Sequence, residues 1–188
     1  GYVSNFIVDD NEDIIFSSET YHTIEKWSKG SSGSVVLIGI KKLAAGVDRL
    51  DTTELNRPLD FHFDSNNNTI VLDYHTRILK FKPGSTKGTI IAGLGFPQYN
   101  YYLLSGMAFP QSFDLDPNDN MYIADYGNHR ILRWDYLATA PVFVYPTAKD
   151  AEDGNYSKFS PYNILPNHMF FDKDNNDIWW YKPQGNSG

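Results

Sequence analysis

The order of apolar and polar positions repeats along the chain. In each copy, a turn rich in Asp and Asn precedes a short apolar stretch, which a second polar turn separates from a second apolar stretch. Residues 9–27 and 116–134 align without a gap, residues 64–81 form a copy that is one residue shorter, and a fourth copy begins at Asp172. The same order of segments in four places indicates a repeat protein.

Each repeat predicts a four-stranded antiparallel meander, because short apolar runs alternate with turn-forming Asn and Asp residues. No stretch shows helical periodicity over more than a turn or two. The first strand of the repeat is predicted at residues 60–63 and 112–115, and the second at 69–72 and 121–124. The third is predicted at 77–81 and 130–134, and the fourth at 34–38, 89–92 and 141–144.

Four-stranded sheets repeated in this way are typical of a β-propeller. The expected fold class is therefore all-β, in a single propeller domain or a fragment of one. Its predicted blades are numbered 1 to 4 and cover, approximately, residues 1–50, 51–107, 108–160 and, for a partial blade, 161–188.

Composition narrows the class of partner. The 188 residues carry a net charge of -7 and include no cysteine, which excludes disulfides and thiolate metal sites. An acidic chain without a run of Lys and Arg disfavours non-specific nucleic-acid binding. No apolar run approaches the roughly 20 residues of a membrane-spanning helix. Glycosylation sequons at Asn67 and Asn155 fall in predicted turns or loops and favour an extracellular or cell-surface location.

The turn between the second and third strands carries a family resemblance. Residues 121–131 read MYIADYGNHRI and resemble the signature of NHL repeats, and residues 71–78, VLDYHTRI, resemble a shortened copy. The first repeat departs from the signature, with Ser18 in place of the Asp and Thr23 in place of the Arg. The resemblance implies a propeller that is usually six-bladed.

The Asp and Arg of that signature are predicted to be structural. Asp73 and Arg77 flank the turn in blade 2, and Asp125 and Arg130 flank it in blade 3. An ion pair at this place would fix the turn, and its carboxylate can also accept backbone N–H groups.

Three complete repeats and part of a fourth do not close a six-bladed ring. The faces of the end blades would then be apolar and uncovered, which is unusual for a soluble monomer. The pattern therefore predicts that the remaining blades belong to a longer chain; the alternatives are that the chain self-associates or that it closes as a collapsed four-bladed ring.

The turns between the second and third strands, with the long connections between blades, are the predicted contact surface. Tyr and His side chains combine an apolar ring with a polar tip, which suits a binding interface. The leading hypothesis is a non-catalytic interaction scaffold that binds a protein or glycan through this face. The candidate binding residues are Tyr21, His22, Tyr74, His75, Tyr126, Asn128 and His129.

The innermost strands suggest an alternative. His62, Asp114 and His168 occupy nearby repeat positions, and two imidazoles with a carboxylate can hold zinc in a central channel. NHL-type propellers include the peptidyl-hydroxyglycine amidating lyases, which the resemblance implies use such a metal, although no local motif of those enzymes matches here. The alternative function is thus a metal-dependent lyase or hydrolase, while the leading hypothesis requires no cofactor.

Two further possibilities are weaker. Residues 172–177 read DKDNND and superficially resemble a calcium loop, but Asp177 and Pro183 stand where that loop needs Gly and Glu. The equivalent segments of the other blades are hairpin turns. Some NHL domains bind RNA through a basic face, for which Lys41, Arg49 and Arg57 are the candidates, against the acidic balance of the chain.

Overall fold

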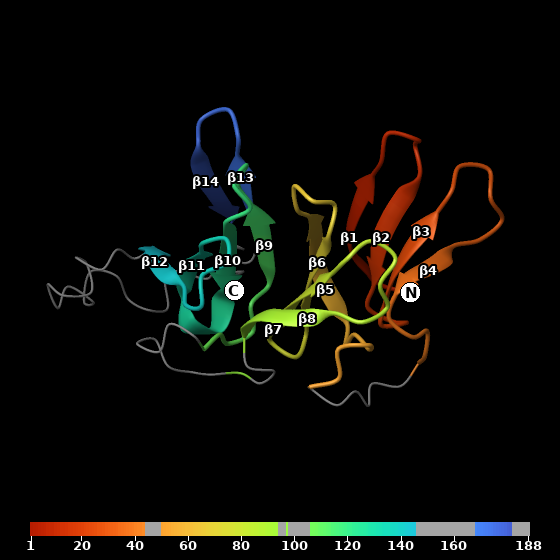
Figure 1. The fold of residues 1–188 in the computed structure, drawn as a ribbon, viewed down its shortest axis with the longest axis horizontal. Coiled ribbons are helices and arrows are strands. Elements are labelled where there is room, and N and C mark those ends of the chain that lie inside the picture. Colours follow the sequence, from red (N-terminus) through yellow and green to blue (C-terminus); the bar gives the residue numbers. More distant parts are fainter. Residues whose placement is uncertain (44–49, 94–96, 98–105, 146–167, 182–188) are drawn as a thin grey trace, which may run out of the picture. The chain divides into compact units, whose positions relative to one another are not determined.

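The computed structural model describes residues 1–43, 50–93, 97, 106–145 and 168–181, and the side chains of residues 143–145, 180 and 181 are not part of this description. By its internal contacts the chain divides into two compact units, Gly1–Gly95 and Phe96–Gly188. Each contains two of the predicted blades (Figure 1). No helix of the described residues is long and apolar enough to cross a membrane.

The first unit contains two four-stranded antiparallel sheets in which sequence neighbours pair. Blade 1 consists of β1 (Val3–Val8), β2 (Ile14–Ser18), β3 (Thr23–Trp27) and β4 (Val35–Ile38). Blade 2 consists of β5 (Pro58–Phe63), β6 (Thr69–Asp73), β7 (Arg77–Phe81) and β8 (Thr89–Gly93).

The second unit repeats the arrangement. Blade 3 consists of β9 (Ser112–Leu115), β10 (Met121–Asp125), β11 (Arg130–Trp134) and β12 (Val142–Tyr145), with a 3-10 turn, η1 (Tyr126–Asn128), between β10 and β11. Blade 4 is described as the hairpin of β13 (His168–Asp172) and β14 (Asp177–Tyr181). The predicted all-β class and four-stranded antiparallel sheets are confirmed.

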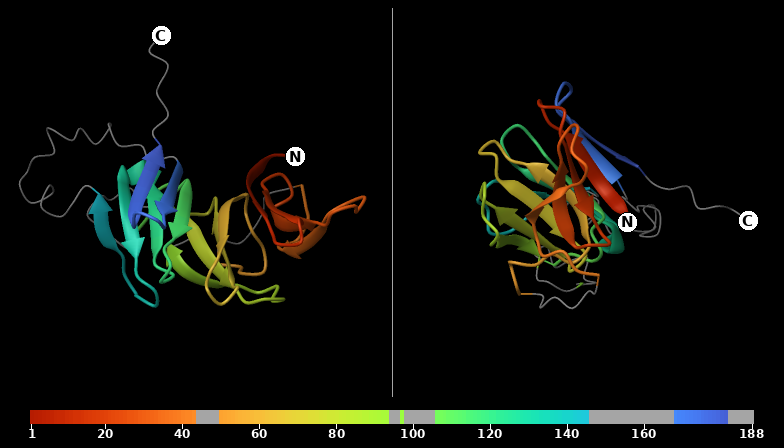
Figure 2. Two further views of the ribbon diagram at one scale, coloured as in Figure 1. Left: turned by 90° about the horizontal axis from the view of Figure 1, so that it is seen from above. Right: turned by 90° about the vertical axis from the view of Figure 1, so that its right-hand side faces the viewer.

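Consecutive blades pack face to face within each unit. In the first unit, Ile15, Ile24 and Ile38 of blade 1 form one buried core with Phe61 and Val71 of blade 2. Burying apolar area of this kind is the main favourable contribution to folding. The two sheets lie side by side in the left view of Figure 2, in agreement with the contacts of β1 and β2 with β5.

In the second unit, β13 lies beside β9 (Figures 1 and 2). Met169 and Phe171 of β13 join a buried core with Ala124 and Ile131 of blade 3. The ring of Phe171 stacks on that of Tyr122, with ring centroids 5.4 Å apart. Every second residue of β13 therefore faces blade 3, as the period of two along a strand requires.

Candidate functional site

A buried Asp–Arg pair holds the turn between β6 and β7 in blade 2. Arg77 Nε donates to Asp73 Oδ2 over 3.0 Å, and both side chains are fully buried. The guanidinium also donates to the carbonyl oxygens of Asp51 (2.6 Å) and Glu54 (2.8 Å), and Asp73 Oδ2 accepts the N–H of Asn56. The pair thus binds the turn to the segment that leads into β5.

Blade 3 repeats this arrangement with different neighbours. Arg130 Nε lies 2.7 Å from Asp125 Oδ2, again with both side chains fully buried. Asp125 accepts the N–H of Ala108 (2.7 Å) and the amide of Asn128 (3.0 Å), while Arg130 also donates to the carbonyl oxygen of Gly106. We refer to the two arrangements as the Asp–Arg ties.

Burial and charge act in opposite directions on the carboxylates of the ties. Burial is the larger effect and raises the pKa of Asp73 to about 6, against the lowering effect of Arg77 and the backbone N–H donors. Burial likewise raises the pKa of Asp125, opposed first by Arg130. The ties therefore hold their charges in a dry environment, where only direct hydrogen bonds compensate for lost hydration.

Blade 1 has a different network in place of a tie. Ser18 pairs with Thr23 across β2 and β3, at the register position that Asp73 and Arg77 occupy in blade 2. Here the buried carboxylate is Glu25, which accepts the hydroxyl of Thr23 over 2.7 Å and the ammonium of Lys41 over 3.1 Å. The buried carboxylate of blade 1 thus lies on β3, two residues after the position that Arg77 occupies in blade 2, and not on the second strand.

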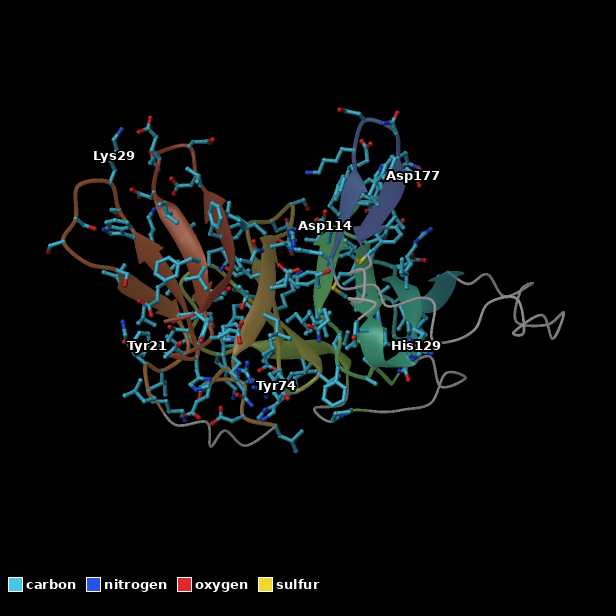
Figure 3. The ribbon with its side chains drawn as sticks, turned by 180° about the vertical axis from the view of Figure 1, so that it is seen from behind. Tyr21, Lys29, Tyr74, Asp114, His129 and Asp177 are labelled. Carbon is cyan, nitrogen blue, oxygen red and sulfur yellow. The ribbon has the colours of Figure 1, made fainter. Side chains whose placement is uncertain are left out.

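A partly exposed aromatic surface lies at the same end of blades 1 and 2, and we define its residues as the turn surface: Tyr21, Lys41, Arg57 and Tyr74. Lys41 Nζ lies over the Tyr21 ring at 4.5 Å from its centroid, and the Arg57 guanidinium lies over the Tyr74 ring at 4.8 Å. Tyr74 is 45% exposed. Figure 3 shows both tyrosines at this end of their blades and Lys29 at the opposite end.

Both cations of the turn surface are paired with carboxylates. Arg57 donates through Nε (3.2 Å) and Nη2 (2.8 Å) to Glu19 Oε2, and Lys41 pairs with the buried Glu25. Close by along the chain, Lys42 pairs with Glu54 over 2.5 Å. The surface therefore has little uncompensated positive charge with which to attract a polyanion.

The predicted binding residues divide by their burial. Tyr74 is exposed, whereas Tyr21, His75, Tyr126 and His129 are half-buried. In blade 2, Asn56 Nδ2 and His75 Nε2 lie 2.6 Å apart, so the His75 ring also contacts the segment before β5.

His22 and Asn128 are buried, in contrast to the exposed contact surface expected of the turn residues. His22 Nδ1 accepts the N–H of Arg57 over 2.9 Å, and burial, with Lys42 and Arg57 nearby, lowers its pKa. Asn128 donates to Asp125 in the tie of blade 3. A hydrogen bond to a residue 35 positions away holds His22 below the surface, and a local one to Asp125 holds Asn128 there.

Glu19 and Arg57 belong to this region but were not predicted as binding residues. They are 38 positions apart in the sequence and meet only because blade 2 packs on blade 1. The sequence suggests Arg57 only as part of a basic patch with Lys41 and Arg49, and Arg49 lies outside the described residues. No local spacing pattern signals such a pair.

Two of the three proposed channel ligands have other hydrogen-bond or charge partners. His62 Nε2 lies 3.5 Å from Asp60 Oδ1 in the first unit. In the second unit, Asp114 accepts the N–H groups of Leu115 (2.7 Å) and Phe171 (2.8 Å), and His168 is exposed at the start of β13. Within the described ranges, no three His, Asp or Glu side chains are grouped as a metal site would require.

The Asp and Asn hairpins have one recurring structure. Asp64 Oδ1 accepts the N–H groups of Asn66 (3.0 Å) and Asn68 (2.8 Å), and Asp172, which begins the calcium-like segment, likewise accepts those of Asp174 and Asn175. Such bonds form tight turns without a metal. The sequon residue Asn67 lies in an exposed turn of this kind, while Asn155 lies outside the described residues.

Comparison with known proteins identifies the fold. No family model and no curated protein matches the sequence. Among solved structures, a streptogramin B lyase aligns with a TM-score of 0.54 at 16% identity over 95% of this chain and 47% of its own. The fold is a β-propeller. The chain spans about half the length of the lyases it resembles.

Two other propeller neighbours have different descriptions. A putative gluconolactonase aligns with a TM-score of 0.51 at 10% identity, over 77% of this chain and 51% of its own. An auxiliary nutrient-binding protein from Bacteroides thetaiotaomicron aligns with a TM-score of 0.50 at 16% identity, over 64% of this chain and 34% of its own. At these identities the likeness concerns the fold, which supports many unrelated functions.

Proposed function

We propose that this chain is part of an NHL-type propeller that acts as a non-catalytic interaction scaffold. The recurrence of the Asp–Arg tie at matching positions of blades 2 and 3 supports the NHL assignment. The partner is a protein or a glycan, bound at the turn surface. A nutrient-binding propeller among the structural neighbours is consistent with ligand binding by this fold.

The observation that carries the proposal is the construction of the turn surface. Tyr21 and Tyr74 each lie beneath a cation, at the same end of two packed blades. Salt bridges orient Lys41 and Arg57, and both side chains remain about half exposed. Rigid aromatic rings beside oriented polar groups lose little conformational entropy when a partner binds.

The near balance of charge at this surface favours an uncharged or mixed-charge partner over a phosphate backbone. Lys41 and Arg57 are each offset by a glutamate. Stacking on a Tyr ring and hydrogen bonding to a guanidinium suit the apolar face and hydroxyl groups of a sugar, and equally a peptide.

The test compares two variants for binding to a glycan microarray and to a panel of purified extracellular proteins. Replacing Tyr21 and Tyr74 together with Ala should abolish binding, because aromatic anchors often contribute about 2 kcal/mol or more each. Lys29→Ala, at the opposite end of blade 1, is the control and should bind normally. Equal binding by the double variant and the parent, or no binding by the parent on either panel, would contradict the proposal.

An extracellular location is part of this proposal and has its own test. Asn67 lies in an exposed turn, where a glycan would meet no packed neighbour. Expression through a eukaryotic secretory pathway should yield a glycosylated protein whose mass falls on treatment with an N-glycosidase. Thr69→Ala destroys this sequon and should reduce that mass change.

A further inference from the structure

One face of blade 1 is apolar and exposed. The pairing of β1 with β2 and of β2 with β3 places Phe6 opposite Phe16, Val8 opposite Ile14, and Ile14 opposite Trp27, all on the same face. Phe6 is 62% exposed, Val8 56% and Trp27 47%. We call this the open face of blade 1. Large contiguous apolar surfaces on proteins usually mark interaction sites.

The equivalent face of blade 2 is buried. There Phe61 pairs with Val71, and Val71 with Leu79, in the same register as Phe6 with Phe16 in blade 1. All three side chains are fully buried, in the core that blade 1 contributes to. The face exposed in blade 1 is thus the one that, in blade 2, receives the preceding blade.

Blade 4 exposes the complementary kind of face. Met169 and Phe171 pack against blade 3, so the alternate residue Phe170 points away from it, paired with Trp179 on β14. Phe170 is 57% exposed and Trp179 55%. In blade 3 the corresponding face includes Tyr122, which packs on the following blade through Phe171. We call the surface of Phe170 and Trp179 the open face of blade 4.

We propose that the open face of blade 4 packs onto the open face of blade 1 in a second copy of this chain. Both units show the same rule of contact, in which one face of a blade covers the opposite face of the next. The two open faces are the two halves of such a contact.

A contact between two different faces of identical chains is heterologous. It either closes into a ring or continues as an open chain. Closure by two copies would leave neither open face exposed, so a dimer is the expected product. The two open faces share no residue with the turn surface, so the dimer is expected whether or not a partner binds there.

The first experiment measures the mass of the 188-residue chain in solution by sedimentation velocity over a range of concentrations. The parent should be a dimer. Phe6→Glu, Val8→Lys and Phe170→Glu should each raise the dissociation constant by about tenfold or more, since each charge would be buried at the contact. Leu137→Glu, at a position 83% exposed in a turn of blade 3, is the matched control and should remain dimeric.

The second experiment identifies the faces that meet, and it exploits the absence of natural cysteine. Val8→Cys and Trp179→Cys chains with different tags are mixed and treated with a short bismaleimide. A cross-link between the two tags is expected, in excess of that between two Val8→Cys chains or between Leu137→Cys and Trp179→Cys. A parent that is monomeric at all concentrations, a dimer unaffected by all three charge variants, or the absence of the 8–179 cross-link would each overturn the proposal.

Discussion

Arg77 and Arg130 each keep a guanidinium away from water at the centre of a turn. A buried charge is tolerated only where it is paired with an opposite charge and its remaining N–H groups are hydrogen-bonded. Here backbone carbonyl oxygens accept from the guanidinium N–H groups that the carboxylate does not reach. The consequence is that each arginine cannot be replaced without leaving a buried carboxylate unpaired.

Arg130→Ala should therefore reduce the free energy of unfolding by about 3–5 kcal/mol, the usual cost of removing one partner of a buried pair. This exceeds the loss of roughly 1–3 kcal/mol for a charge-assisted bond in a partly buried turn. Urea unfolding followed by circular dichroism gives the value.

The matched control is Arg133→Ala, three positions along the same strand. Arg133 pairs with Asp135 at the surface, with side-chain exposures of 39% and 45%. Such a pair contributes about 1 kcal/mol or less. Equal losses in the two variants would show that burial of the tie does not determine its contribution.

His22 makes the stability of blade 1 sensitive to acid. Its pKa is lowered from 6.5 in the folded chain, first by burial and then by Lys42 and Arg57. The unfolded chain therefore takes up the proton first, so the free energy of unfolding falls as the pH drops below about 6.5 and continues to fall until the folded-state pKa is passed. Protonation also removes the lone pair with which Nδ1 accepts the Arg57 N–H.

The comparison variant is His22→Asn. Its amide oxygen can accept the same N–H without titrating, and Asn tolerates the positive φ of 61° at this position. Unfolding in urea at about pH 7.5 and about pH 5.5 should show a smaller loss of stability in the variant than in the parent. Identical losses would assign the pH dependence to other groups.

At the scale of the strands, the sequence was informative because the strands and hairpins are determined locally. The predicted strands at 77–81, 112–115 and 130–134 coincide with β7, β9 and β11. Asp and Asn side chains that bond their own backbone specify the hairpins without help from distant residues. The locations of these elements are therefore encoded within a few residues.

Gly39 is required both by its backbone conformation and by the close approach of a neighbouring strand. Gly39 follows β4 with a φ of +89°, and a Cβ there would lie 2.5 Å from the backbone oxygen of His22. Gly30 has a similar φ of +80°, but a Cβ there would meet nothing within 4 Å.

Gly30→Ala should cost only the left-handed strain of about 1–2 kcal/mol. Gly39→Ala should cost about 1–3 kcal/mol more, because the backbone must also move to admit the methyl group. Thermal unfolding of the two variants under identical conditions measures the difference. Equal melting temperatures would contradict the steric argument.

At the scale of the whole molecule, the propeller could be predicted and the site could not. The fold follows from a repeated pattern that is visible in one dimension. The turn surface depends on pairs such as Glu19 with Arg57, which packing between blades brings together. The residue types of His22 and Asn128 predict a surface position, yet both are buried: His22 by a hydrogen bond to Arg57 of the next blade, and Asn128 by its bond to Asp125 within the turn.

The sequence also suggests a zinc site at His62, Asp114 and His168, which can be tested by measuring zinc binding to the whole chain. The carboxylate of Asp114 accepts two backbone N–H groups, and His62 lies near Asp60. After dialysis against zinc and removal of the unbound metal, we expect well below one equivalent of zinc per chain, measured by mass spectrometry. One tightly held equivalent, lost in His62→Ala, would instead favour the lyase or hydrolase alternative.

The Asp–Arg ties have a consequence for how such a protein can diversify. Arg77 fastens the connection into blade 2 at the carbonyl groups of Asp51 and Glu54, so the end of that connection is fixed whatever residues precede it. Because the bonds are made to backbone atoms, they place no demand on the side chains there. Each tie is thus a fixed attachment point for a connection whose length and sequence can change. The binding surface formed by the connections can therefore evolve while the sheets keep their register.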